Sequence, residues 1–118
     1  METERLLIRK FMPDDWHDLY EYLSQEEVVK YEPYGIFTEE QAKQEAISRS
    51  DNPDFWAVCL KDTEKRIGNI YLSKQEFDTG YVFNSDYQGK GYATEAVKAL
   101  IEELFANDEA NCCYVRSA

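Results

Sequence analysis

The stretch from Tyr87 to Ala96 constrains this chain more than any other part of it. It joins a β-like segment, residues 80–83, to a strongly amphipathic helical pattern, with Gly89 and Gly91 directly before the helix. Glycines let the backbone approach a ligand closely. The first amides of a helix have no intrahelical acceptor and lie at the positive end of its dipole. The sequence therefore predicts a loop that holds a phosphate group through backbone amides.

Two common phosphate-binding loops do not fit this stretch. A Walker A loop requires a lysine followed by serine or threonine, whereas Lys90 is followed by Gly91. A dinucleotide-binding fingerprint requires a third glycine or alanine where this chain has Thr94, and it lies near the start of a parallel βαβ unit. A glycine turn that only caps the helix is the plain alternative.

The pattern that does fit is Gln/Arg-x-x-Gly-x-Gly/Ala, formed here by Gln88, Gly91 and Ala93. With the strand before it and the helix after it, this pattern resembles the acyl-CoA pyrophosphate loop of the GCN5-related N-acetyltransferase (GNAT) superfamily. The wider stretch is most similar to the branch that contains the ribosomal-protein N-terminal acetyltransferases. The resemblance implies an N-acetyltransferase with acetyl-CoA as co-substrate and no metal.

The remaining patterns predict an α/β fold in one domain over residues 1–118, in the order β-α-α-β-β-β-α-β. The expected strands cover residues 3–9, 55–60, 67–72, 80–83 and 112–116, and the expected helices begin at Pro13, at the capping box from Thr38, and near Ala93. The first helix is expected to bury Trp16, Leu19, Tyr20 and Leu23. This order matches a GNAT-like, largely antiparallel central sheet flanked by helices. The family continues with a further helix and two strands, so we expect a C-terminally incomplete domain.

Composition and charge exclude several classes of protein. The chain has 13 basic and 24 acidic residues, a net charge of −11 and no basic cluster, which argues against a nucleic-acid partner. The negative charge favours a cationic acceptor, and a role in solubility alone explains it equally well. No apolar run approaches the ~20 residues of a membrane span, and the start does not resemble a signal peptide. The three cysteines have no metal-binding spacing. We therefore expect a cytoplasmic protein with no membrane partner.

The resemblance also implies where the cofactor lies. The pyrophosphate would bind the backbone N–H groups of six consecutive residues: Gln88, Gly89, Lys90, Gly91, Tyr92 and Ala93. Val82 and Phe83 match the family's fourth strand, whose backbone pairs with the pantetheine arm, and Asn84 and Ser85 lie at its exit. Val82 and Phe83 also fit an ordinary core strand, and both roles are compatible because the pairing uses only backbone atoms.

The catalytic groups are less sharply defined. Some family members use a carboxylate on the fourth strand as general base, and Asp78 lies near the matching position. The run Asp78-Thr79-Gly80 fits a turn equally well. Glu32 is the second candidate, in an aromatic loop where Tyr31 and Tyr34 could hold a cationic amine by stacking. Packing at the surface is the plain role for these tyrosines. Tyr114 could donate a proton to the leaving thiolate, although the family uses a tyrosine on a helix.

Two functions follow from these patterns. The first is acetyl transfer from acetyl-CoA to a primary amine (a peptide N-terminus, a lysine or a small amine) by direct attack. The alternative is a catalytically silent CoA-binding or interaction module formed by a truncated acetyltransferase domain. An unpaired strand at residues 112–116 would leave an exposed edge. We therefore expect a homodimer or other self-association, with weak acetyl transfer by the chain alone.

Overall fold

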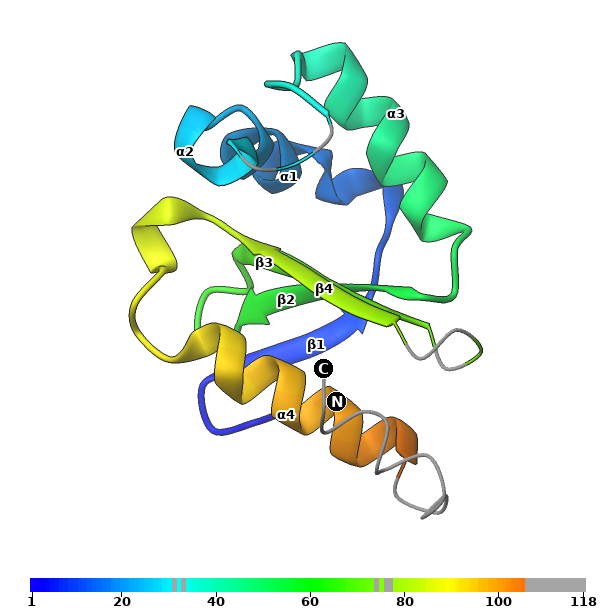
Figure 1. Cartoon of the computed structure of the whole chain (residues 1–118), viewed down its shortest axis with the longest axis vertical. Helices are drawn as coiled ribbons and strands as arrows, with labels where there is room; N and C mark the ends of the chain where they lie inside the picture. The colour runs from blue at the N-terminus through cyan, green and yellow to red at the C-terminus, as the bar shows by residue number, and fades with distance from the viewer. Residues whose placement is uncertain (31, 33, 74, 76–77, 106–118) are drawn as a thin grey trace.

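The computed structural model describes residues 1–30, 32, 34–73, 75 and 78–105. Its elements form three layers: a central sheet, with α1, α2 and α3 on one face and α4 on the other (Figure 1). The strands are β1 (Leu6–Lys10), β2 (Phe55–Leu60), β3 (Arg66–Ser73) and β4 (Asp78–Phe83). The helices are η1 (Pro13–Asp15), α1 (Trp16–Leu23), α2 (Glu26–Val29), α3 (Glu39–Ser50), η2 (Ser85–Tyr87) and α4 (Tyr92–Phe105).

The described strands form an antiparallel sheet in the order β1-β2-β3-β4, which leaves β4 at one edge. The predicted fold class, an α/β protein with a largely antiparallel sheet between helices, is confirmed. β4 begins at Asp78, two residues earlier than expected, because Asp78 and Thr79 continue the pairing with β3. The strand expected at residues 112–116 lies outside the described residues.

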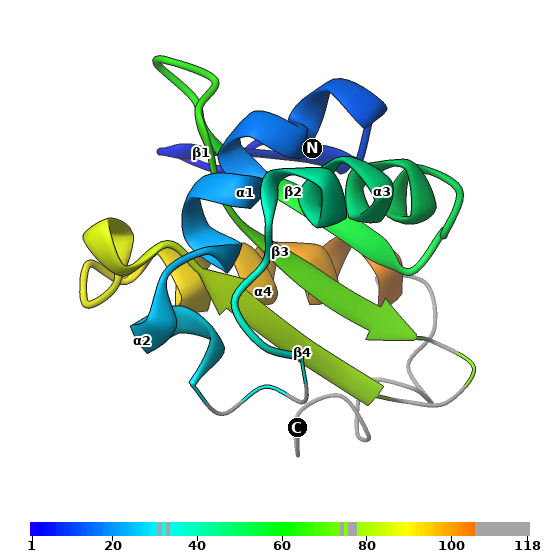
Figure 2. The same ribbon diagram turned by 90° about the horizontal axis from the view of Figure 1, so that it is seen from above.

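Each face of the sheet carries its own apolar core because successive strand residues point to opposite faces. The core on the α4 side contains Leu6, Ile8, Val58, Ile67, Ile70, Leu72, Phe83, Ala96 and Leu100. The core on the α1–α3 side contains Phe11, Leu19, Tyr22, Leu23, Val29, Ala46, Ala57 and Cys59. In Figure 2, α1 and α3 cross in front of the strands and α4 lies behind them. The sheet, including its edge strand β4, therefore separates two differently packed cores.

The buried face of α1 differs from the prediction. Tyr20 is exposed, whereas Tyr22 is fully buried and its hydroxyl donates to Asn69 Oδ1 at 2.8 Å. Leu19, Tyr22 and Leu23 follow the i, i+3, i+4 spacing, and Tyr20 lies about 100° around the helix from Leu19. The prediction also missed α2, which is a single turn and too short to produce a periodic pattern.

A buried carboxylate holds α1 against the sheet. Asp15 is 1% exposed and accepts hydrogen bonds from Arg9 Nη2 at 2.8 Å and from Arg66 Nε at 2.6 Å. Burial by itself raises the pKa of Asp15, but the hydrogen bonds from Arg9, the Met12 amide and Arg66 outweigh it, and the pKa lies below its usual value. Asp15 therefore stays charged and joins η1 to β1 and β3.

Candidate functional site

The turn after β4 is held by a buried amide. Asn84 is fully buried, and its Oδ1 accepts from the Asp86 amide at 2.9 Å and from Gln25 Nε2 at 3.2 Å. Its Nδ2 donates to Glu21 Oε2 at 2.7 Å. The Ser85 amide donates to Gln25 Oε1 at 3.0 Å. The side chain of Asn84 is thus committed to fixing η2 against α1 and the start of α2, so contact with a cofactor would have to use its backbone.

The loop between η2 and α4 requires both of its glycines. Gly89 has φ +76° and Gly91 has φ +81°, a left-handed conformation that residues with a Cβ rarely adopt. Gln88 Nε2 donates to the Phe83 carbonyl at 2.9 Å and ties the loop to the end of β4. The prediction of a glycine loop between a strand and a helix is confirmed for these residues.

The start of α4 presents backbone donors without acceptors. The Gln88 amide donates weakly to the Ser85 carbonyl at 3.4 Å, so it is partly engaged. The amides of residues 89–93 make no hydrogen bond to any residue in the described part of the chain. The first helical bond runs from the Glu95 amide to the Gly91 carbonyl at 3.0 Å. These amides lie at the positive end of the α4 dipole, which is a favourable environment for an anion.

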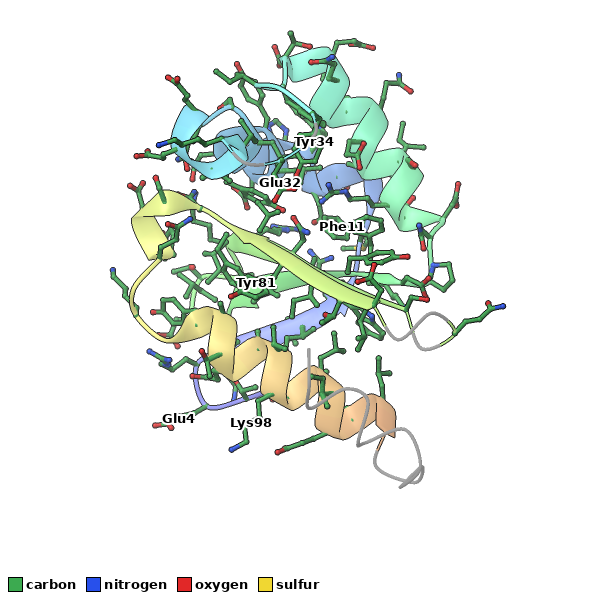
Figure 3. The ribbon with its side chains drawn as sticks, viewed as in Figure 1. Glu4, Phe11, Glu32, Tyr34, Tyr81 and Lys98 are labelled. Atoms are coloured by element: carbon green, nitrogen blue, oxygen red, sulfur yellow. The ribbon has the colours of Figure 1, made fainter. Side chains whose placement is uncertain are left out.

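A cavity of about 360 Å³ runs from this loop to β4, the edge strand among the described strands. It is lined by Val28, Glu32, Tyr81, Val82, Phe83, Tyr87, Gln88, Gly89, Gly91, Ala93 and Thr94. Figure 3 shows Glu32 on the α1–α3 side of β4 and Tyr81 on its α4 side. The cavity therefore joins six of the predicted cofactor residues to Glu32, one of the two candidate bases.

Four residues that line the cavity were not assigned from the sequence. Tyr87 and Thr94 belong to the loop and first turn of α4, so their position in the motif could have identified them. Tyr81 could have been found from strand alternation beside Val82. Val28 gave no such signal, because it lies on the short helix α2 and reaches the cavity only through the tertiary fold.

Other predicted site residues lie elsewhere. Asp78 is exposed at the far end of β4 from the loop, paired with Ser73, and does not line this cavity. The Tyr34 ring packs edge-on against Phe37 with 5.2 Å between ring centroids. Burial and the nearby charge of Glu32 raise the pKa of Tyr34.

Two predicted residues, Tyr31 and Tyr114, lie outside the described residues. Of the predicted loop residues, Lys90 is exposed, with its Nζ 5.7 Å from the centroid of the Tyr87 ring. Tyr92, the first residue of α4, is half-buried below the guanidinium of Arg5. Within the described ranges, no helix is long and apolar enough to cross a membrane. The same residues contain no group of three His, Cys, Asp or Glu that could hold a metal ion.

Comparison with known proteins identifies the family. The family model "Acetyltransferase (GNAT) domain" matches residues 5–117. The uncharacterized N-acetyltransferase YnaD of Bacillus subtilis (strain 168) is 45% identical over 108 residues, which cover 87% of this chain and 64% of YnaD. This chain thus spans somewhat less than two thirds of the length of that relative.

Solved structures agree with this family. A GNAT-family acetyltransferase from Bacillus anthracis is 37% identical, with a TM-score of 0.82 over 90% of this chain and 66% of that one. The ribosomal-protein-S5-alanine acetyltransferase from Vibrio fischeri shares the fold, with a TM-score of 0.71 and 21% identity over 99% of this chain and 79% of that one. The chain therefore belongs to the GNAT family of acetyltransferases.

Proposed function

We propose that this chain binds acetyl-CoA at the loop before α4 and transfers the acetyl group to a primary amine. The observation that carries the proposal is that the amides of residues 89–93 have no acceptor among the described residues, and that Gly89, Gly91 and Ala93 line the same cavity as Glu32. An amide-lined anion site and a carboxylate at one cavity are what direct attack by an amine on a thioester requires.

The cofactor side fits a pyrophosphate. A Cβ at Gly89 would meet no atom within 4 Å, whereas a Cβ at Gly91 would lie 3.5 Å from Arg5 Nη2. The amides of Gly89 to Ala93 would donate to the phosphate oxygens, and the partly engaged Gln88 amide and the ammonium of Lys90 would add to them. The backbone of Val82 and Phe83, at the edge of the sheet, would pair with the pantetheine arm, with Asn84 and Ser85 at its exit.

For the general base we propose Glu32. Its carboxylate belongs to the cavity, whereas Asp78 lies at the other end of β4 and would have to act through intervening water. Glu32 would accept a proton from the ammonium, so that the neutral amine can attack the thioester. The C–N bond then forms, the C–S bond breaks, and the second proton lost by the nitrogen balances the proton that the thiolate takes up. Tyr114 remains the proposed donor of a proton to the departing thiolate.

The acceptor is proposed to be cationic before it loses its proton. The net charge of −11 attracts such molecules, and Tyr31 and Tyr34 would contact the amine near Glu32. A peptide N-terminus is one candidate, by analogy with the branch that the loop resembles. A lysine or a small amine is equally compatible with this chemistry. We propose a cytoplasmic location, where the three cysteines would stay reduced.

The second candidate function is a CoA-binding or interaction module without catalysis. It requires only the amides before α4 and the cavity that they adjoin, and it needs neither a general base nor a proton donor. Self-association, as a homodimer or larger assembly, belongs to the same proposal, through the strand edge expected at residues 112–116.

A binding and turnover experiment separates these functions. Calorimetry with CoA measures binding, and release of free thiol from acetyl-CoA in the presence of peptide N-termini, lysine and small amines measures transfer. Binding together with thiol release would support the enzyme. Binding without release would favour the silent module, and the absence of binding would contradict both. Light scattering of the same samples tests self-association.

A further inference from the structure

The segment before β1 contacts the first turn of α4, about ninety positions away in sequence. Figure 1 shows this segment beside the start of α4. Glu95 is the point of contact: its Oε2 accepts from the Thr3 hydroxyl and from the Arg5 amide at 3.2 Å. Its Oε1 accepts from Arg5 Nε at 2.8 Å and lies 2.7 Å from Arg5 Nη2.

Arg5 also reaches the loop itself. Its remaining nitrogen, Nη1, donates to the Lys90 carbonyl at 3.1 Å. The guanidinium lies over the Tyr92 ring, 4.4 Å from the centroid. The planar side chain of Arg5 therefore contacts the Lys90 carbonyl, the Tyr92 ring and the Glu95 carboxylate, which lies one turn further along α4.

The bond to Lys90 fixes the direction of the next amide. In a planar trans peptide the carbonyl and the N–H point in opposite directions. Since the Lys90 carbonyl points at Arg5, the Gly91 N–H points away from Arg5. Gly91 lines the cavity, and its amide has no acceptor among the described residues. Gly91 is also the glycine at which rotation of that peptide plane would be least restricted.

We propose that Arg5 is a positioning residue, which holds the Lys90–Gly91 peptide so that the Gly91 amide faces the pyrophosphate of acetyl-CoA. This inference rests on the proposed function. Glu95 in turn holds the guanidinium in place. Burial would raise the pKa of Glu95, but the bonds from Thr3 and Arg5 outweigh it and the pKa lies below its usual value. Glu95 therefore stays charged at neutral pH.

The test compares a ligand that has a pyrophosphate with one that lacks it. Calorimetry with CoA and with pantetheine is performed on the parent chain, Arg5→Ala and Arg5→Lys. We expect Arg5→Ala to weaken CoA binding about tenfold, equivalent to about 1.4 kcal/mol, and to leave pantetheine binding unchanged. Arg5→Lys should recover little of the lost CoA affinity, because an ammonium cannot span Glu95 and the Lys90 carbonyl as the planar guanidinium does.

Two further variants separate positioning from charge and from folding. If Arg5 only neutralised Glu95, the double variant Arg5→Ala/Glu95→Gln would bind CoA like the parent; we expect it to stay weak. The matched control is Lys61→Ala. Lys61 holds the same segment, through the Thr3 carbonyl at 3.1 Å and Glu2 at 3.6 Å, and does not contact the loop in the described structure. It should bind CoA normally.

The outcomes distinguish this inference from the function on which it rests. A parent chain that does not bind CoA would overturn the proposed function and this inference with it. If the parent binds CoA, this inference alone would be overturned in four cases. These are an Arg5→Ala variant that binds CoA as tightly as the parent, an equal loss of CoA and pantetheine binding in Arg5→Ala, an equal loss of CoA binding in Lys61→Ala, or an Arg5→Ala/Glu95→Gln variant that binds CoA like the parent.

Discussion

The two sides of the cavity are built from different parts of the protein. The cofactor side lies within one stretch of sequence, residues 82–94, and offers backbone amides that a pair of left-handed glycines exposes. The acceptor side consists of side chains from separate elements, with Val28 and Glu32 from the helical layer and Tyr81 from β4. The cofactor side should therefore lose CoA binding when a glycine is replaced by a residue with a side chain. The acceptor side should lose activity when a functional group is removed from one of its side chains.

The two sides meet at the turn after β4. Asn84 links that turn to Glu21 and Gln25, which belong to the same helical layer as Val28 and Glu32. The loop is thus held at its first end by the hydrogen bonds of the buried Asn84 amide, one of which is accepted by the Glu21 carboxylate, and at its second end by the half-exposed pair of Arg5 and Glu95. The first attachment should matter more for folding, because a buried polar group that loses its partner costs more than an exposed ion pair contributes.

The largest effect is expected on the acceptor side. Glu32→Gln should lower kcat about a hundredfold, because the amine loses its proton acceptor, and it should leave CoA affinity within a factor of two. Steady-state kinetics and calorimetry measure the two quantities. Glu27→Gln is the matched control, since Glu27 is an exposed carboxylate of α2 that does not line the cavity. A loss of kcat in Asp78→Asn but not in Glu32→Gln would assign the base to β4 instead.

The second-largest effect is expected at Asn84, which links the cofactor side of the cavity to the helical layer of the acceptor side. Asn84→Leu should lower the free energy of unfolding by about 2 kcal/mol, because it removes the hydrogen bonds that Glu21, Gln25 and the Asp86 amide make with Asn84. Urea denaturation with an unchanged m-value would measure it. Ser24→Ala removes an exposed hydroxyl that donates to the Glu21 carbonyl, and it should cost less than about 0.5 kcal/mol. Equal losses in the two variants would contradict a special role for Asn84.

A third change tests the cofactor side. Gly91→Val should weaken CoA binding at least tenfold, about 1.4 kcal/mol, because a β-branched residue resists φ +81° and its side chain obstructs the backbone. Gly35→Val is the control, since Gly35 has open space around it and no left-handed φ. Calorimetry on folded samples at low temperature compares them. If Gly91→Val bound CoA as tightly as the parent, the pyrophosphate site would have to lie elsewhere.

The smallest effect is expected at the exposed ion pair. The folded-state pKa of Glu95 is lowered, so its contribution to stability is fully present above its unfolded pKa, about 4.5, and is lost as the pH falls through the folded value. Because solvent screens this pair, Glu95→Gln should cost less than about 1 kcal/mol at pH 7. Urea denaturation from pH 3 to 7 should show the variant and parent converging in acid. A difference that grew as the pH fell would refute this assignment.

Local patterns were sufficient for the strand, loop and helix around residues 80–104. The glycines, the amphipathic period of α4 and the preceding strand all act within a few residues, and the elements lie where they were expected. The pattern of α1 did not identify every residue of its buried face. Both Tyr20 and Tyr22 carry large aromatic side chains; Tyr22 shares the buried face of Leu19 and Leu23, and its hydroxyl finds a partner in Asn69 on β3.

The sequence by itself determined the family, the order of the described strands and long helices, and the loop that is proposed to bind the pyrophosphate. These depend on backbone geometry and on interactions between near neighbours. Only the tertiary structure brought Glu32 to the cavity, committed the Asn84 side chain to α1 and placed Arg5 on the loop. Asn84 and Glu21 are 63 positions apart, Arg5 and Lys90 are 85 positions apart, and Glu32 is 49 or more positions from the cavity residues of β4 and the loop. No local period encodes such a contact, because it forms only when the sheet and its two helical layers pack together.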